Sequence, residues 1–273
     1  MNRQTHKPVD FFLSKWYLDY IGDDGETMIF YAAELHWYHR KVYYSSWLSY
    51  NRNSGSALKS TFRHVTFPVD KNNTIIWSCP EFGVSGTWKP LEKMLQARIF
   101  ESEEGTVDWT CYQPASEVHL RVMDKDLTGK GYVERLILTV PPWRMSFDEL
   151  RWGRFASDDI SIVWIEMKGY DTRQWVWFNG EQTGEGIITD EYISLPDKNL
   201  ILNLDRGEEL EADKKIQSVV RKLFRYIPGI KGSVPVNFLM ADTCKWLSRG
   251  VLVGSNNKSE GKAIHELVNI RAQ

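Results

Sequence analysis

The sequence predicts a mainly all-β protein made of two similar antiparallel domains. Short apolar and β-branched segments recur about every 8–12 residues, separated by turn-forming Gly, Asn and Asp, and this spacing is typical of an antiparallel barrel or sandwich. Aromatic residues, which favour strands, are abundant: the 273-residue chain has 12 Trp, 12 Tyr and 12 Phe. Pro141 and Pro142 interrupt the pattern near mid-chain, which predicts domains 1–142 and 143–273.

The first half is a series of short strands that end at clear turn signals. The stretches "IGDDGE" (21–26) and "NRNSGS" (51–56) contain the Gly, Asn and Asp residues that tight turns require. The expected strands of this half are 14–20, 27–37, 42–50, 60–67, 74–78, 81–88, 95–102, 106–113, 116–124 and 131–140.

The second half repeats this style, with one exception. From Ile216 onward the apolar residues fall at helical spacing, and Pro228 would end a helix, so a helix is expected near 211–226. The expected strands are 151–156, 161–167, 174–179, 186–195, 200–204, 236–242, 246–254 and 262–270.

An internal repeat is also expected. Trp16 and Trp152 lie about half a chain length apart, and each begins a short aromatic strand. An Asp-Asp pair follows each of them, at 23–24 and at 158–159, and a long apolar strand comes next. With the Pro-Pro boundary, this similarity favours two related β domains.

Charge and composition exclude several classes of protein. With 34 basic and 36 acidic residues the net charge is −2, which gives no overall field to attract nucleic acid, so no nucleic-acid partner is expected. No apolar run approaches the ~18–20 residues of a membrane span, and "MNRQTHKPVD" lacks the apolar core of a signal peptide. We therefore expect a cytoplasmic protein with no integral membrane segment.

The cysteines and the motifs give no sign of a metal or a cofactor. Cys79, Cys111 and Cys244 are odd in number and far apart, so neither a disulfide framework nor a zinc site is expected. The sequence has no nucleophile elbow, no phosphate-binding loop and no dinucleotide fingerprint. The expectation is a protein without a cofactor.

Five charged residues lie in predicted strands that look too apolar to face solvent: Glu34, Glu134, Arg135, Arg154 and Glu166. Burying an unpaired charge is costly, so each needs a partner or a polar cavity. One interpretation is that Arg–carboxylate pairs hold the two domains together. The second is a polar spot inside an aromatic cavity, and the third is simple exposure.

A carboxyl group in an apolar pocket has a raised pKa and can act as a general acid. Side chains alternate faces along a strand, so Tyr132, Glu134 and Leu136 share one face and Arg135 lies on the other. This pattern makes Glu134 a candidate acid, together with Glu34. The abundant aromatic rings are equally suited to lining an apolar ligand cavity.

Several stretches resemble a known family. "FLSKWYLDYIGDDGETMIFYAA", "GKGYVERLILTVPPW", "LRWGRFASDDISIVWIE", "WLSRGVL" and "KAIHELV" are similar to the lipocalin-like superfamily of hydroxyneurosporene synthases, the carotenoid 1,2-hydratases. Fungal Diels–Alderase-type cyclases and tocopherol cyclases look related. The resemblance implies two tandem lipocalin-like (calycin) antiparallel β-barrel domains that hold an apolar ligand in or between them. It implies no single reaction, since family members hydrate double bonds, cyclise chains or have no assigned activity.

Three hypotheses for function follow. The first is a cofactor-free hydratase or cyclase that protonates a hydrophobic isoprenoid- or polyene-like molecule, with Glu134 or Glu34 as the acid. The second is a non-catalytic carrier of a hydrophobic small molecule, and the third is a structural module whose barrels are filled by their own rings. The oligomeric state stays open. The residues expected to contact a ligand are Trp16, Tyr31, Arg135, Trp152, Arg154, Trp164, Glu166 and His265.

Overall fold

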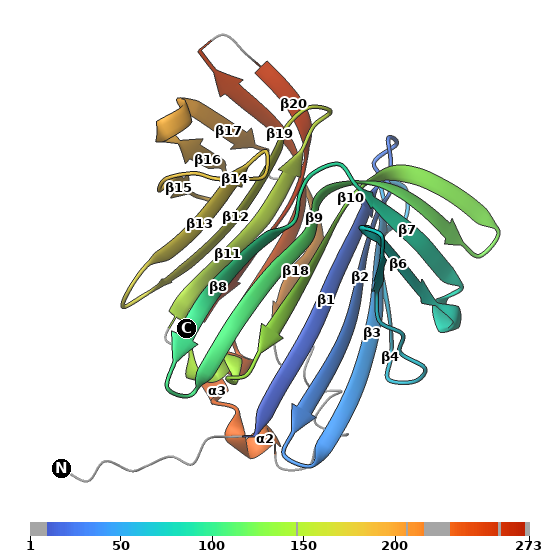
Figure 1. The fold of residues 1–273 in the computed structure, drawn as a ribbon, viewed down its shortest axis with the longest axis vertical. Coiled ribbons are helices and arrows are strands. Elements are labelled where there is room, and N and C mark those ends of the chain that lie inside the picture. Colours follow the sequence, from blue (N-terminus) through green and yellow to red (C-terminus); the bar gives the residue numbers. More distant parts are fainter. Residues whose placement is uncertain (1–9, 146, 206, 216–229, 256–257, 271–273) are drawn as a thin grey trace.

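The computed structural model describes residues 10–145, 147–205, 207–215, 230–255 and 258–270. In this part of the chain, two curled antiparallel sheets of ten strands each form the molecule, and they lie side by side (Figure 1). The predicted mainly all-β fold class is confirmed. Among the described residues no pairing closes either sheet, so each one is a half-barrel.

The first sheet has the strand order β4-β3-β2-β1-β10-β9-β7-β6-β5, and β8 pairs with β9. Its strands are β1 (Phe11–Ile21), β2 (Thr27–Trp37), β3 (Arg40–Asn51), β4 (Gly55–Thr61), β5 (Val69–Lys71), β6 (Thr74–Cys79), β7 (Val84–Pro90), β8 (Leu95–Ser102), β9 (Gly105–Val122) and β10 (Lys125–Leu138). Its central strands β1 and β2 are apolar on both faces, because alternate side chains enter two different cores.

The second sheet has the order β14-β13-β12-β11-β20-β19-β17-β16-β15, and β18 pairs with β19. Its strands are β11 (Phe147–Ala156), β12 (Ser161–Gly169), β13 (Arg173–Phe178), β14 (Glu181–Gln182), β15 (Ile187–Ile188), β16 (Tyr192–Leu195), β17 (Leu200–Leu204), β18 (Glu208–Lys215), β19 (Asp242–Gly254) and β20 (Lys258–Asn269).

The two sheets therefore repeat one strand order, each strand of the second sheet matching the strand ten places earlier. Both Asp-Asp pairs lie between the first two strands of a sheet, at 23–24 and 158–159. Trp16 and Trp152 lie on β1 and β11 but face different cores. Domains 1–142 and 143–273 remain our proposal for how the chain divides.

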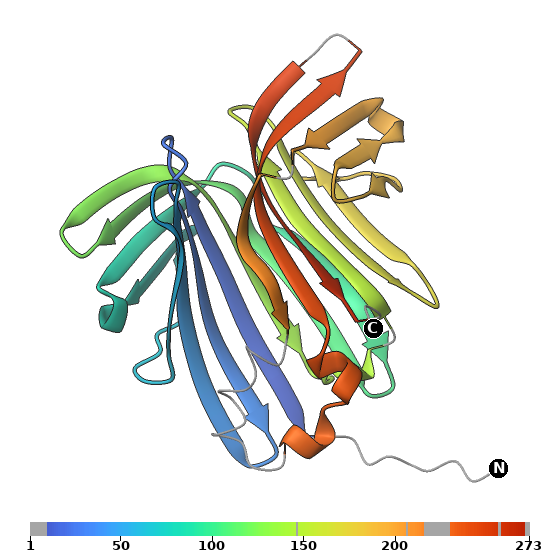
Figure 2. The same ribbon diagram turned by 180° about the vertical axis from the view of Figure 1, so that it is seen from behind.

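Three cores fill the molecule. One occupies the hollow of the first half-barrel and includes Phe30, Trp77 and Trp88. A second fills the hollow of the second half-barrel around Phe155 and Trp164. The third lies between the two sheets and has the most buried residues; the strands that meet there are seen from both sides in Figures 1 and 2. The rings of the half-barrels thus pack on one another, and polar cavity residues are found in the layer between the sheets.

Strand alternation assigns the side chains to these cores. On β1, Tyr17 and Asp19 face the layer between the sheets, whereas Trp16 and Leu18 face the first half-barrel. Glu134 lies opposite Tyr17 in the register of β1 with β10, so it faces the same layer. The alternation predicted for 131–140 therefore holds.

The helices of the described residues are short, and the one at Val236–Leu239 occupies the start of the strand predicted at 236–242, which is therefore wrong there. Glu211 to Lys215 continue strand β18, and residues 216–226 of the expected helix lie outside the described part. Helices α2 (Ile230–Ser233) and α3 (Val236–Leu239) follow. The described residues contain no helix that is long and apolar enough to cross a membrane.

Candidate functional site

A cavity of about 150 Å³ lies between the two sheets. Both sheets supply its walls, so it exists only where the two halves of the chain meet. It is lined by Lys15, Tyr17, Tyr31, Ile99, Trp109, Glu134, Leu136, Leu150, Trp152, Ile165, Glu266 and Val268. Of the residues predicted to form a site, Glu134, Tyr31 and Trp152 come together here.

Glu134 is a buried carboxyl group with an asymmetric set of partners. Its Oε2 accepts hydrogen bonds from Trp109 Nε1 at 2.5 Å, Tyr132 Oη at 2.7 Å and Trp152 Nε1 at 3.0 Å. Its Oε1 has no hydrogen-bond partner among the described residues. Burial raises the pKa of Glu134 above its usual value, and the three donors and Lys15 offset only part of that effect. A proton on this carboxyl group would therefore sit on Oε1.

Lys245, which is only 2% exposed, lies behind the cavity wall and holds two residues that line it, Tyr31 and Glu266. Its Nζ lies 3.0 Å from Glu266 Oε2 and 4.0 Å from Glu211 Oε2, and it donates to Tyr31 Oη at 2.5 Å. Burial by itself lowers the pKa of Lys245, but Glu266, Tyr31 and Glu211 raise it overall. Lys245 is therefore a fixed ammonium group that anchors Tyr31 across the two sheets.

Lys15 on β1 also lines the cavity. Its Nζ lies over the Tyr31 ring, 4.6 Å from the centroid. Burial lowers the pKa of Lys15, although Glu266 and Glu134 act in the opposite direction. The ammonium charge of Lys15 interacts with Glu134, so ionisation of Glu134 would raise the pKa of Lys15.

Aromatic rings enclose the carboxyl group of Glu134. Tyr17 contacts Trp152 with centroids 5.0 Å apart and Tyr132 at 5.9 Å, both edge-to-face. Trp109 stacks on Trp177 of the second sheet at 4.7 Å. Tyr17, Trp109 and Trp152 line the cavity, and aromatic rings of this kind can stabilise a cation placed over their faces.

Other predicted site residues lie outside the cavity. Trp16 packs inside the first half-barrel, stacked on Tyr112, and the Arg135 guanidinium lies 5.3 Å from its ring centroid. Glu34 is half-buried near the end of β2, where it contacts His36 and lies 4.0 Å from Lys41 Nζ. The face of β2 that carries Glu34 is turned away from the layer between the sheets.

Four more predicted residues are buried and have partners. They belong to ion pairs and ring contacts away from the cavity walls. Arg154 pairs with Asp19 across the sheets, with Nε–Oδ2 at 3.0 Å and Nη2–Oδ1 at 2.5 Å. Glu166 lies 3.0 Å from Lys168 Nζ. His265 Nε2 is 2.9 Å from Ser248 Oγ, and Trp164 lies in the second half-barrel core near His265, with centroids 6.5 Å apart.

Sequence reasoning missed Lys15 and Glu266, which line the cavity, and Lys245, which contacts Glu266 and Tyr31. Lys15 lies two positions before Tyr17 in a strand that also contains Trp16, so the argument that selected Arg154 would also have selected Lys15. Lys245 precedes Trp246, and Glu266 follows His265, in equally apolar strands. Lysine is usually exposed, so these signals were weak. The described residues contain no group of three or more His, Cys, Asp or Glu side chains placed to hold a metal ion.

No protein-family model and no curated protein sequence matches the chain. Among solved structures, CghA with Sch210972 aligns with a TM-score of 0.55 at 10% identity, covering 96% of this chain and 89% of that one. Kievitone hydratase from Nectria haematococca has a TM-score of 0.52 at 12% identity, with 94% and 88% covered. A candidate AttH protein from Nitrosomonas europaea has a TM-score of 0.52 at 8% identity, with 96% and 93% covered. The resemblance predicted from the sequence is confirmed at the level of the fold.

Proposed function

We propose that this protein is an enzyme of the hydratase or cyclase type, acting on a hydrophobic small molecule whose reacting end enters the cavity between the sheets. The observation that carries the proposal is the environment of Glu134, a buried carboxyl group that has a raised pKa and accepts three hydrogen bonds on Oε2 but none from the described residues on Oε1. The fold shared with kievitone hydratase adds support, since that protein is by name a hydratase.

The proposed first step is a proton transfer from Glu134 Oε1 to a carbon of a substrate double bond. The π electron pair forms the new C–H bond, and the adjacent carbon becomes a cation. The Glu134 carboxylate that remains is stabilised at Oε2 by Trp109, Tyr132 and Trp152, which already point at it. Donors fixed before the reaction need no reorganisation, which is the main source of electrostatic catalysis.

The cation would then be held by the aromatic walls. The rings of Tyr17 and Trp152 line the cavity, and a cation over such a ring is stabilised by about 0.5–2 kcal/mol. Capture by water forms a C–O bond and an oxonium ion, which returns a proton to the Glu134 carboxylate and leaves an alcohol. Capture by a second double bond of the same molecule closes a ring and leaves a new carbocation, which loses a proton from the adjacent carbon to the Glu134 carboxylate and becomes an alkene. Both outcomes use the same acid, so the proposal covers either reaction.

The size of the cavity limits what it can hold. A volume of about 150 Å³ is similar to that of an apolar cavity that binds benzene. One ring-sized end of a substrate would fit beside Glu134, and the rest of a longer chain would extend beyond it. A substrate with a compact terminal alkene or isoprenoid unit therefore suits this site.

A direct test is to incubate purified protein with linear isoprenoid polyenes and to analyse the products by mass spectrometry. Hydration adds one water to the mass, and cyclisation leaves the mass unchanged but shifts the retention time. We expect Glu134→Gln to lower turnover by ~10²–10⁴-fold, the usual contribution of a general acid.

Glu34→Gln is the matched comparison, because Glu34 was the other predicted acid and lies outside the cavity. We expect this variant to keep its turnover. Equal activity of the Glu134→Gln protein and the wild type would refute the assignment of Glu134. Tight binding without turnover, unchanged in both variants, would instead favour a carrier.

A further inference from the structure

A second, larger pocket lies at one end of the first half-barrel, on the opposite face of the first sheet from the cavity described above. Its volume is about 470 Å³, within the range of ~300–1,000 Å³ typical of small-molecule sites. The strands β2, β3 and β4 form one side, and the turn between β9 and β10 forms the other. It is lined by Glu26, Met28, Trp47, Ser49, Tyr50, Asn51, Ser54, Gly55, Ala57, Val122, Met123, Asp124, Lys125 and Leu127.

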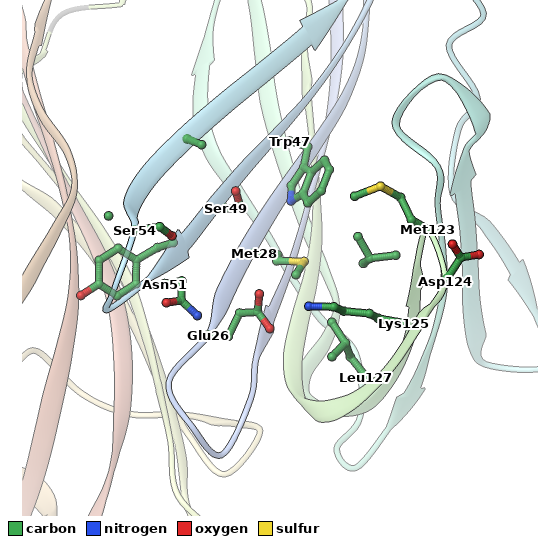
Figure 3. Close-up of a pocket in the computed structure, with 14 residues that line it drawn as sticks. Glu26, Met28, Trp47, Ser49, Asn51, Ser54, Met123, Asp124, Lys125 and Leu127 are labelled. Carbon is green, nitrogen blue, oxygen red and sulfur yellow. The ribbon is translucent and has the colours of Figure 1, made fainter.

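Trp47 at the base of this pocket has an unsatisfied donor. Its side chain is buried, with 6% of the residue exposed, and Nε1 has no hydrogen-bond partner in the described part of the chain. Figure 3 shows the nitrogen edge of the indole turned toward the space between Ser49 and Met28. Buried donors without an acceptor are rare in folded proteins, and each one calls for an explanation.

The indole ring itself is held firmly in place. Phe30 stacks on Trp47 with centroids 6.3 Å apart, and Phe82 contacts it at 6.4 Å. On its other side the Lys59 ammonium lies 4.8 Å from the ring centroid. A ligand would therefore meet a donor that is already oriented, which lowers the entropy cost of binding.

Apolar and charged groups are arranged in two levels. Met28 and Val122 belong to the same buried core as Trp47, and Leu127 packs against that core, so this part of the pocket wall is apolar. Glu26 and Lys125 extend into the pocket from opposite sides (Figure 3), and Asp124 lies in the same turn as Lys125. Because charges of both signs are present, a ligand with a net charge would gain little from them.

We propose that this pocket is a second ligand site, which binds a neutral, largely apolar small molecule through a carbonyl oxygen that accepts a hydrogen bond from Trp47 Nε1. The apolar body of the ligand contacts Met28, Val122 and Leu127. Any hydroxyl groups lie at the charged end, where Glu26 accepts and Lys125 donates hydrogen bonds. The proposal is independent of the reaction proposed for Glu134.

The experiment uses 6-propionyl-2-(dimethylamino)naphthalene, a neutral aromatic ketone whose emission shifts to the blue in apolar surroundings. We expect saturable binding to the full chain. Ala57→Trp should weaken it at least tenfold, because Ala57 lines the pocket opposite Ser49 in the register of β3 with β4. Trp47→Phe removes the donor and should weaken binding by about 2–10-fold, the range expected for one hydrogen bond.

Two controls keep the result interpretable. Leu58→Trp adds the same ring on the next residue of β4, which is exposed and lies outside the pocket lining, so binding should be unchanged. Glu134→Gln should also bind the probe as the wild type does. Circular dichroism shows whether Trp47→Phe folds. If it does not, the comparison of Ala57→Trp with Leu58→Trp is sufficient to test the proposed site. Equal affinity in those two variants, or no saturable binding to the wild type, overturns the proposal.

Discussion

At the scale of single residues, the proton affinity of Glu134 is set by two opposing effects. Burial favours the neutral acid, and the three hydrogen bonds to Oε2 favour the carboxylate. Burial prevails, so the pKa is raised. An acid with a raised pKa keeps its proton at a higher pH than an exposed glutamate does. Activity that depends on this proton should therefore fall as the pH rises through the raised pKa.

Removal of one donor should raise the pKa further. Tyr132 Oη donates to Glu134 Oε2 at 2.7 Å, and Tyr132→Phe deletes that hydrogen bond while it keeps the ring. The carboxylate loses a partner, so we expect its titration to move to higher pH. The shift can be followed by NMR of ¹³C-labelled glutamate, without any substrate.

Tyr17→Phe is the control for that measurement, because Tyr17 Oη donates to Asp19 Oδ2 at 3.1 Å and not to Glu134. We expect little change in the Glu134 titration in this variant. A downward shift of the Glu134 pKa in Tyr132→Phe would contradict the role given to the Tyr132 hydroxyl.

Residue types alone could identify part of the candidate site. Glu134 and Trp152 were recognisable, because a charge and rings alternate in strands too apolar for solvent. Glu34 satisfied the same criterion yet lies outside the cavity, since the sequence does not say which face of a strand meets the other half of the chain. Lys15 and Lys245 could not be ranked above other lysines without knowing their neighbours.

At the scale of elements, β1 shows why the strands could be predicted but the core that each face of a strand contacts could not. Both of its faces are apolar, because one packs in the first half-barrel and the other between the sheets. Trp16 and Trp152 look equivalent in sequence, but Trp16 faces a half-barrel and Trp152 faces the layer between the sheets. Alternation thus gives two sets of residues per strand, and long-range packing decides which set forms the site.

Gly153 on β11 provides a test of packing at this scale. A Cβ atom there would collide with the Trp164 ring and lie 2.8 Å from the His265 Cβ. Glycine within a strand often marks such a close approach. We expect Gly153→Ala to lower the free energy of unfolding by about 1–3 kcal/mol, as overpacking does. Urea denaturation of the variant and the wild type measures this change in the free energy of unfolding.

Gly232 is the comparison for that substitution, because an added Cβ there meets nothing within 4 Å. We expect Gly232→Ala to change the free energy of unfolding by less than ~0.5 kcal/mol. Equal stability of Gly153→Ala and the wild type would mean that the Trp164 ring moves freely, contrary to the packing described.

At the scale of the whole molecule, local sequence patterns predict where strands lie but not how the two sheets pack against each other. Turn residues and alternation predicted most of the β segments, because these depend on neighbours in sequence. The strands predicted at 236–242 and 60–67 were wrong in part, since 236–239 forms helix α3 and β4 ends at Thr61. The layer between the sheets depends on contacts between residues more than a hundred positions apart, such as Lys245 with Tyr31. Residues 211–215 show the same limit, since they pair with β19 although they were included in the helix predicted near 211–226.

The buried pair of Arg154 and Asp19 joins the two sheets and is the clearest test of how they hold together. Both side chains are almost fully buried, at 1% and 0% exposed. Loss of one partner leaves an unpaired charge in the interior, so we expect Arg154→Met to lower the free energy of unfolding by about 3–5 kcal/mol. Arg249→Met, which breaks an exposed pair with Glu260, should have a much smaller effect.

The double variant Arg154→Met/Asp19→Leu separates charge pairing from packing. With both charges removed, no uncompensated charge remains, although the Tyr17 hydroxyl loses its acceptor on Asp19, and apolar side chains can fill the layer between the sheets. We therefore expect the double variant to recover most of the stability lost in Arg154→Met, so the two substitutions should be strongly non-additive in urea denaturation. Additive losses would mean that each side chain stabilises its own sheet separately, and the ion pair would then not be what couples the two halves of the chain.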